Sequence, residues 1–331
     1  MENGSFDNIV DRRISSSFCV DSEVNEVQEV VANYYRNFFD PTNLSFIVMP
    51  NNVCNFKCIY CYQNHDERHM SKETVANFIS AIKRYYEEVK LRRFYIEWFG
   101  GEPLISYPTI HAITQELNSF FANTDVNYHY GITTNGYLLN EDTIDFLLSN
   151  GFTFFQITLD GGRDNHNKNR PRADGGPTWD KICENLLSMS KKQERFHVSI
   201  RVNYNLETFE CISELLAYIK VNLDDRFTVF FHNIGKWGGE NDSELEVIDY
   251  ELVPYLQHML MQEAVAAGVE PNVNYSFFKP YGRICYAGMP YNFTLGSDGK
   301  LRKCNEEDSK LDSFNVVGTI ENGQIELDVD K

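Results

Sequence analysis

The sequence contains no long apolar stretch. Its first residues, Met1 to Arg13, are polar and charged, without the apolar segment that a signal peptide carries. No later run approaches the ~20 consecutive apolar residues that a helix needs to cross a bilayer. We therefore expect a cytoplasmic protein rather than a secreted or membrane-embedded one.

Positive charge is also scarce. The chain has 30 Lys and Arg residues against 48 Asp and Glu residues, a formal net charge of -18 at pH 7. Proteins that bind nucleic acids use a surplus of basic residues, so this balance argues against a nucleic-acid partner and weakens a role in tRNA modification. The acidic surplus favours solubility, and an acidic face could also attract a basic peptide.

The remaining composition is that of an ordinary globular protein. With 331 residues, 42% of them hydrophobic, the chain can form one large α/β domain or a barrel with a small appendage. Most of its aromatic side chains are expected in the core. Because a reducing cytoplasm disfavours disulfides, clusters among the eight cysteines are better explained as metal ligands.

Strand-like apolar runs alternate with helical stretches, which is typical of βαβ units. The predicted strands are Leu44–Met49, Phe94–Phe99, Tyr128–Thr134, Thr153–Leu159, His197–Asn203 and Phe227–Asn233. The predicted helices are Val24–Phe38, Ser71–Val89, Tyr107–Phe121, Asn140–Ser149, Thr178–Lys191, Glu207–Lys220 and Tyr250–Ala267.

These repeats predict an α/β fold, a partial (β/α)6 TIM barrel that stays open because it has fewer than eight strands. Its ligand site should lie at the carboxyl ends of the strands. After about Tyr275 the helical pattern stops, and Phe293–Lys303 predicts a β-hairpin with a turn at Gly296–Gly299. We expect a lead-in with a helix over residues 1–43, the barrel over 44–270 and part of a small second domain over 271–331.

Three cysteines follow the first predicted strand. Cys54, Cys58 and Cys61 have CxxxCxxC spacing on a loop. Three thiolates can bind three irons of a [4Fe-4S] cluster and leave the fourth iron open to another ligand. The alternative is a structural zinc site, which needs four ligands, so His65 or His69 would have to complete it.

This motif resembles the signature of the radical S-adenosylmethionine (SAM) superfamily, with Tyr60 at its aromatic position. A second segment, Trp98–Pro103, resembles the GGEP motif of that family. The resemblance implies that Gly100, Gly101 and Glu102 receive the amino group of the methionine moiety, with the glycines allowing close approach and Glu102 accepting from the ammonium. Taken alone, the two glycines could simply form a turn at a strand end.

Further residues at the predicted strand ends match the same family. Thr134 and Asn135 lie at the end of the third predicted strand, and Thr158 lies at the end of the fourth. The resemblance implies that Thr158 hydrogen-bonds SAM and that Arg170 pairs with its carboxylate, although a surface salt bridge is the simpler explanation for Arg170. Arg201 on the fifth strand is a weaker candidate, because core strands rarely carry arginine without a partner.

The C-terminal part resembles the SPASM-type subgroup, which includes anaerobic sulfatase-maturating enzymes and peptide maturases. Cys285, Gly299 and Cys304 fit the opening of its auxiliary-cluster motif. Two ordinary buried cysteines are the alternative. The other cysteines are interpreted as core or incidental residues: Cys19, Cys183 and Cys211.

The chain departs from this subgroup in two ways. No cysteine follows Cys304, and two thiols alone cannot hold a [4Fe-4S] cluster. Either the chain is truncated, or the auxiliary site is vestigial or has other ligands. In addition, the position of the sulfatase-maturase base is Asn305, and an amide cannot act as a base. Glu306 and Glu307 remain as candidate bases.

The resemblance therefore implies reductive cleavage of SAM by a [4Fe-4S] cluster, with a 5'-deoxyadenosyl radical that takes a hydrogen from a substrate. A peptide or protein is the predicted substrate, and a flavodoxin or ferredoxin is the expected reductant. Three alternatives stay open. They are a sulfatase-maturating enzyme, a radical enzyme acting on a small metabolite, and a non-catalytic iron-sulfur or zinc-binding module.

Overall fold

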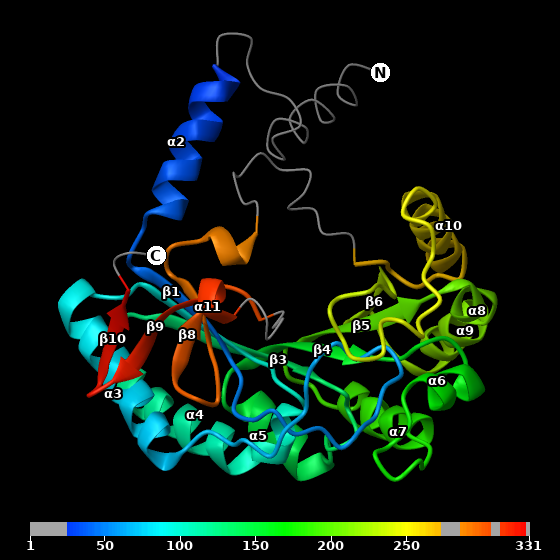
Figure 1. Cartoon of the computed structure of the whole chain (residues 1–331), viewed down its shortest axis with the longest axis horizontal. Coiled ribbons are helices and arrows are strands. Elements are labelled where there is room, and N and C mark those ends of the chain that lie inside the picture. The colour runs from blue at the N-terminus through cyan, green and yellow to red at the C-terminus, as the bar shows by residue number, and fades with distance from the viewer. Residues whose placement is uncertain (1–24, 273–284, 306–311, 329–331) are drawn as a thin grey trace, which may run out of the picture.

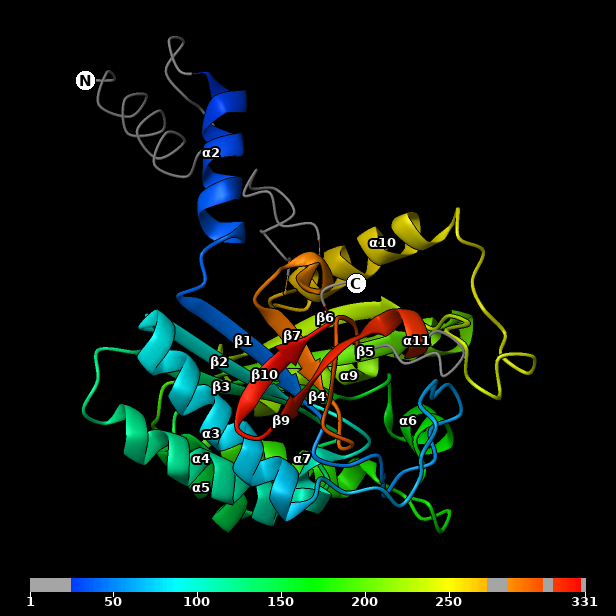
Figure 2. The same ribbon diagram turned by 60° about the vertical axis from the view of Figure 1, so that its left-hand side comes forward.

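The computed structural model of the chain describes residues 25–272, 285–305 and 312–328. Six parallel strands alternate with helices, as the sequence predicts. The strands are β1 (Asn43–Val48), β2 (Arg93–Trp98), β3 (Asn127–Thr134), β4 (Phe152–Thr158), β5 (His197–Tyr204) and β6 (Phe227–Asn233). The helices that follow them are α3 (Lys72–Val89), α4 (Tyr107–Phe121), α5 (Glu141–Ser149), α6 (Arg163–Asn169), α7 (Trp179–Ser190), α8 (Leu206–Glu210), α9 (Ile212–Asn222) and α10 (Val253–Ala266). Before β1 stands α2 (Glu26–Phe38), which points away from the sheet in both views (Figures 1 and 2).

The parallel strands form the larger part of one ten-stranded sheet. Its order is β10-β9-β8-β7-β1-β2-β3-β4-β5-β6, so β6 lies at one edge and does not pair back to close a barrel. The predicted open (β/α)6 barrel is therefore confirmed. The carboxyl ends of β1 to β6 meet on one side of this sheet, where its loops gather.

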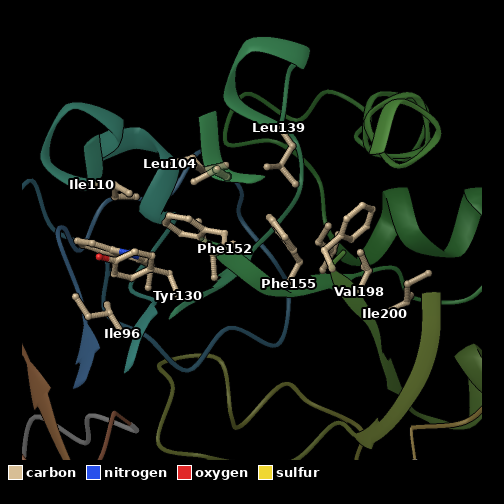
Figure 3. Close-up of a cluster of buried hydrophobic side chains, with 14 of the residues drawn as sticks. Ile96, Leu104, Ile110, Tyr130, Leu139, Phe152, Phe155, Val198 and Ile200 are labelled. Atoms are coloured by element: carbon tan, nitrogen blue, oxygen red, sulfur yellow. The ribbon is translucent and has the colours of Figure 1, made fainter. Parts of the chain in front are cut away.

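The two faces of the sheet differ in character. On β2, buried Phe94, Ile96 and Trp98 alternate with the partly exposed Tyr95 and Glu97. The buried residues face the helices and form the core, which the close-up in Figure 3 shows between strands and helices. The alternate residues face the concave side, which leaves that side available for a ligand.

Two helical predictions needed correction. The predicted helix Glu207–Lys220 is divided at Cys211, whose backbone leaves the helical region and whose N–H bonds to Thr208 O, 3.1 Å away. In addition, helix α6 was not predicted, because its residues are all polar and give no apolar face from which a helix could be recognised.

The C-terminal segment continues the barrel sheet. The predicted hairpin is confirmed as β7 (Asn292–Leu295) and β8 (Lys300–Arg302), and β9 (Val316–Glu321) and β10 (Gln324–Leu327) extend it in antiparallel fashion. Strand β7 pairs in parallel with β1, so it lies beside the first barrel strand. Two short elements flank the hairpin: η3 (Tyr286–Gly288) and α11 (Asp312–Asn315).

In the described parts of the chain, no helix combines the length and apolar character that crossing a membrane requires. Three residues named from the sequence lie outside the described residues: Cys19, Glu306 and Glu307.

Candidate active site

The cysteine loop lies at the carboxyl end of β1 and borders a cavity of about 360 Å³. Cys54, Cys58 and Cys61 all line this cavity. The loop runs along the segment after α6, where Lys57 N–H donates to Pro171 O (2.9 Å) and Ile59 N–H to Asn169 O (3.0 Å). The three thiols are thus presented on one side of a loop with fixed backbone contacts.

The Gly-Gly pair explains how this loop reaches the end of β2. Gly100 has φ +126°, and a Cβ there would lie 2.6 Å from Asn51 O. A Cβ on Gly101 would lie 2.2 Å from Val53 O, and Glu102 N–H donates to the same carbonyl at 2.7 Å. Both glycines also line the cavity. The absence of side chains at Gly100 and Gly101 therefore allows the cysteine loop to pack on the end of β2. A side chain at either position would collide with the backbone of that loop.

The thiols differ in their surroundings. Burial raises the pKa of Cys54 to about 12 and that of Cys58 to about 11. Burial also acts on Cys61, but His65 Nε2 lies 3.3 Å from its Sγ, and the net effect lowers the pKa of that thiol. Two desolvated thiols at a cavity wall are the kind of ligand that a bound cationic metal centre keeps deprotonated.

Of the two histidines that could complete a zinc site, only His65 lies beside one of the three thiols. His65 contacts Cys61, but His69 Nδ1 instead bonds Ser106 Oγ at 3.0 Å. Within the described residues, no three or more His, Cys, Asp or Glu side chains are grouped so that they could hold a single metal ion.

Arg170 projects from the end of α6 into the same cavity. Its side chain is 7% exposed, and Nη1 donates to Tyr60 Oη at 2.8 Å. Its buried Nε has no hydrogen-bond partner, and the guanidinium reaches the Asp160 carboxyl only through the Tyr60 hydroxyl and by electrostatic attraction. The surface salt bridge considered above is therefore absent, and a buried guanidinium without a directly bonded carboxylate is suited to an anionic ligand.

A polar network holds Arg170 and Tyr60 in place. The Tyr60 hydroxyl donates to Asp160 Oδ2, and Asn203 Nδ2 donates to Tyr60 Oη at 3.1 Å. Asp160 also accepts from Asn203 N–H at 2.8 Å. Burial raises the pKa of Asp160, and the nearby Arg170 opposes that rise. This network joins the cysteine loop to the ends of β4 and β5.

Glu102 has a different position from the one expected. It is fully buried, does not line the cavity, and accepts from Leu104 N–H (3.0 Å), Thr134 Oγ1 (2.7 Å) and Asn135 N–H (2.7 Å). The carboxylate thus ties the end of β2 to the end of β3. Its proposed contact with an ammonium group stays a prediction, and its observed hydrogen bonds are structural.

The other predicted residues also line the cavity, and they differ in whether their side chains already form hydrogen bonds within the protein. Asn135 Nδ2 donates to Asn55 Oδ1 at 2.7 Å, so its amide supports the cysteine loop. The Thr158 hydroxyl has no hydrogen-bond partner in the described structure, whereas Arg201 Nε donates to Asn203 Oδ1 at 2.8 Å. Thr158 is the more available donor for a ligand.

Several cavity residues were missed by the sequence analysis. Ile234, Gly235 and Trp237 follow β6 and line the wall, and Tyr286 reaches the cavity from the C-terminal segment, beside the already named Asn305. The inward-facing Glu97, Thr133, Gln156 and His232 also line it. Strand alternation could have indicated the inward set, but nothing local marks the loop after β6.

Cys285 and Cys304 do not line this cavity. Cys285 is exposed, and Cys304 lies near the hairpin, with its Sγ 3.6 Å from Tyr286 Oη. Tyr286 also hydrogen-bonds Asn305, the position at which sulfatase maturases have their base. This position lines the cavity, but its side chain is an amide. An auxiliary cluster at these cysteines stays a prediction.

Comparison with known proteins agrees with this geometry. A family model described as the Radical SAM superfamily matches residues 48–219, more than half of the chain. A cysteine-type anaerobic sulfatase-maturating enzyme of Clostridium novyi (strain NT) is 25% identical over 194 residues, 57% of this chain and 50% of the relative. The chain thus spans about half the length of this curated relative.

Two solved structures have the same fold at low identity. Native anSMEcpe with bound AdoMet and Cp18Cys peptide aligns with a TM-score of 0.66 and 20% identity, covering 85% of this chain and 78% of that one. Streptococcus suis SuiB bound to precursor peptide SuiA aligns with a TM-score of 0.58 and 17% identity, covering 91% and 71%.

Proposed function

Because the chain belongs to the radical SAM superfamily, we propose that it binds a [4Fe-4S] cluster through Cys54, Cys58 and Cys61 and cleaves SAM in order to modify a peptide. One observation carries this proposal. The three thiols border the same cavity as Arg170, a buried guanidinium that has no direct hydrogen bond to a carboxylate among the described residues.

The residues present fit both cofactors. Three thiols supply the ligands of three irons, and the unpartnered Nε of Arg170 and hydroxyl of Thr158 supply donors for a carboxylate or a ribose. When bound and reduced, the cluster and SAM supply the one-electron chemistry that removes a hydrogen atom from a substrate.

The protein's own residues would position the cofactors and exclude water. Arg170 is held by Tyr60, so its guanidinium can orient a carboxylate without first reorganising. Tyr286 and Asn305 border the cavity on the C-terminal side, and Trp237 borders it on the side of the β6 loop. Residues at the cavity wall could shield a reactive intermediate from solvent.

A peptide is preferred over a sulfatase-type substrate because of Asn305. The resemblance to sulfatase maturases requires a base at this position, whereas here an amide lies at the cavity and bonds Tyr286. The similar structure of SuiB bound to precursor peptide SuiA supports a precursor peptide as the substrate class. A flavodoxin or ferredoxin remains the proposed electron donor.

The proposal is tested by anaerobic reconstitution with iron and sulfide, followed by reduction in the presence of SAM. We expect release of 5'-deoxyadenosine and methionine from the wild-type chain and from Cys211→Ala, a control thiol outside the cavity. A chain that binds one zinc tightly, gains no sulfide-dependent absorbance and releases no 5'-deoxyadenosine would contradict the proposal.

The substrate class is tested with a short peptide encoded next to the gene. Transfer of deuterium from a labelled peptide into 5'-deoxyadenosine would support a peptide substrate. Uncoupled SAM cleavage that no such peptide alters, but that a small metabolite accelerates with deuterium transfer, would assign the chain to the metabolite alternative.

A further inference from the structure

Glu97 is a half-buried acid that the chemistry described above does not use. It lies on the inward face of β2 and borders the same cavity as the three thiols. It is the only carboxylic acid among the described residues that line this cavity. A carboxyl group at this place is therefore available to whatever enters the barrel beside the cofactors.

Two strands hold the Glu97 carboxyl in one orientation. The Tyr95 hydroxyl donates to Oε2, and Thr133 Oγ1 donates to Oε1 at 2.9 Å. Gly131, the partner of Glu97 on β3, leaves space for the carboxyl and the Tyr95 hydroxyl, because a Cβ at Gly131 would lie 2.1 Å from both Glu97 Oε2 and Tyr95 Oη. Each carboxyl oxygen accepts one neutral donor and keeps a second lone pair for another.

No cation within the described chain pairs with Glu97. The two arginines that line the cavity donate elsewhere, Arg170 to Tyr60 and Arg201 to Asn203. Burial accordingly raises the pKa of Glu97 to about 7, although the hydrogen bonds from Tyr95 and Thr133 oppose the rise. Burying an acid without a cation is unfavourable, and a ligand that supplies the cation removes the penalty.

We propose that Glu97 recognises a lysine or arginine side chain of the peptide substrate, an inference that rests on the peptide-modifying function proposed above. The cation would donate to the free lone pairs of the carboxylate while Tyr95 and Thr133 keep it oriented. A basic substrate is also the one that a chain with a net charge of -18 attracts from solution.

The test compares two capped tripeptides, acetyl-Gly-Lys-Gly-amide and acetyl-Gly-norleucine-Gly-amide, which differ only in the ammonium group. Their binding to the reconstituted, SAM-bound protein is measured by anaerobic calorimetry at millimolar peptide concentrations. We expect the lysine peptide to bind roughly tenfold or more tightly than its norleucine analogue, as a charge-assisted hydrogen bond implies. Glu97→Gln should abolish this difference, and Glu97→Asp should retain part of it.

The matched control is Glu116→Gln, which removes an exposed acid paired with Lys83 and should leave the difference intact. The proposal would be overturned if the wild-type protein bound the two peptides equally or did not bind the lysine peptide. It would also be overturned if the difference in affinity persisted in Glu97→Gln. Release of 5'-deoxyadenosine in the same samples without peptide separates this failure from failure of the proposed function. Circular dichroism of Glu97→Gln and Glu97→Asp checks that both variants fold.

Discussion

The chain contains two groups of cysteines, and they differ in how far the fold completes them. Cys54, Cys58 and Cys61 come from one loop whose backbone is bonded to neighbouring strand ends, and all three border one cavity. Cys285 and Cys304 flank the β7-β8 hairpin, and neither reaches that cavity. The closely spaced first group therefore shares one cavity, whereas the two cysteines that the hairpin separates do not reach it.

The arginines of the two regions repeat this contrast. Arg302 in the hairpin forms a double hydrogen bond with Asp298, at 3.0 and 2.9 Å. Arg170 in the barrel has no direct hydrogen bond to a carboxylate in the described structure and is joined to Asp160 only through Tyr60. The arginine of the hairpin is thus paired within the hairpin itself, whereas the Nε of Arg170 at the barrel cavity has no hydrogen-bond partner. Unsatisfied buried groups are a cost to folding that a bound ligand can offset.

The largest expected effect comes from the thiols. Cys58→Ala should abolish the binding of about four irons per chain and all SAM cleavage, because two thiols cannot retain the cluster. Cys304→Ala should leave both unchanged. Iron and sulfide analysis with chromatography of 5'-deoxyadenosine measures this. Equal loss in the two variants would show that the C-terminal cysteines belong to the same site.

A second effect concerns the glycines of the two regions. Gly101→Ala should destabilise the fold by about 3 kcal/mol, since the added Cβ would lie 2.2 Å from a backbone oxygen of the cysteine loop. Gly288→Ala, where no atom lies within 4 Å of the added Cβ, should be nearly neutral. Urea unfolding of both variants provides the comparison. A stable Gly101→Ala protein would mean that the loop can shift away from β2.

The two arginines allow a third comparison. Arg170→Gln should weaken SAM binding by about 2 kcal/mol, the value of a hydrogen bond to a charged group, with iron content unchanged. Arg302→Gln should leave SAM affinity unchanged, because Asp298 already occupies its guanidinium. Equilibrium dialysis with labelled SAM distinguishes them. If both variants retain wild-type affinity, the cavity assignment of Arg170 is wrong.

The smallest effect is a change in stability with pH. In the folded chain burial raises the pKa of Glu97 from its usual 4.5 to about 7, so the folded state holds this proton more tightly than the unfolded state. The acid therefore lowers stability as pH rises from 4.5 through 7. The full difference between these pKa values corresponds to about 3 kcal/mol, and the partial exposure of Glu97 to solvent reduces the effect to about 1 to 2 kcal/mol above pH 7.

The variant Glu97→Gln tests this change without altering the size of the side chain. It should be more stable than the wild-type chain at pH 8 and nearly equal to it at pH 4. Unfolding by urea at the two pH values measures the difference. Destabilisation by this substitution at pH 8 would show that the hydrogen bonds from Tyr95 and Thr133 outweigh desolvation.

Local pattern determined much of the fold. The parallel strands β1 to β6 were predicted to within two residues because a strand buried on its helix-facing side shows itself as a short apolar run. The predicted helix over Glu207–Lys220 was wrong only in being continuous, since Cys211 interrupts it. Helix α6 was not predicted because its buried residues, Asn165, His166 and Asn169, are polar, and polar residues do not indicate a buried face.

The sequence by itself determined the three-cysteine motif, the strand-helix repeats of the barrel and the hairpin, because each of these units depends on residues close together in the chain. Tertiary structure decided the rest. Tyr60 contacts Asp160, Arg170 and Asn203, which follow it by 100, 110 and 143 residues. Only folding could also show that Glu102 is used within the protein while Arg170 and Glu97 face the cavity. The physical reason is that a hydrogen bond depends on which side chains the strand ends bring together, and spacing along the chain does not specify that.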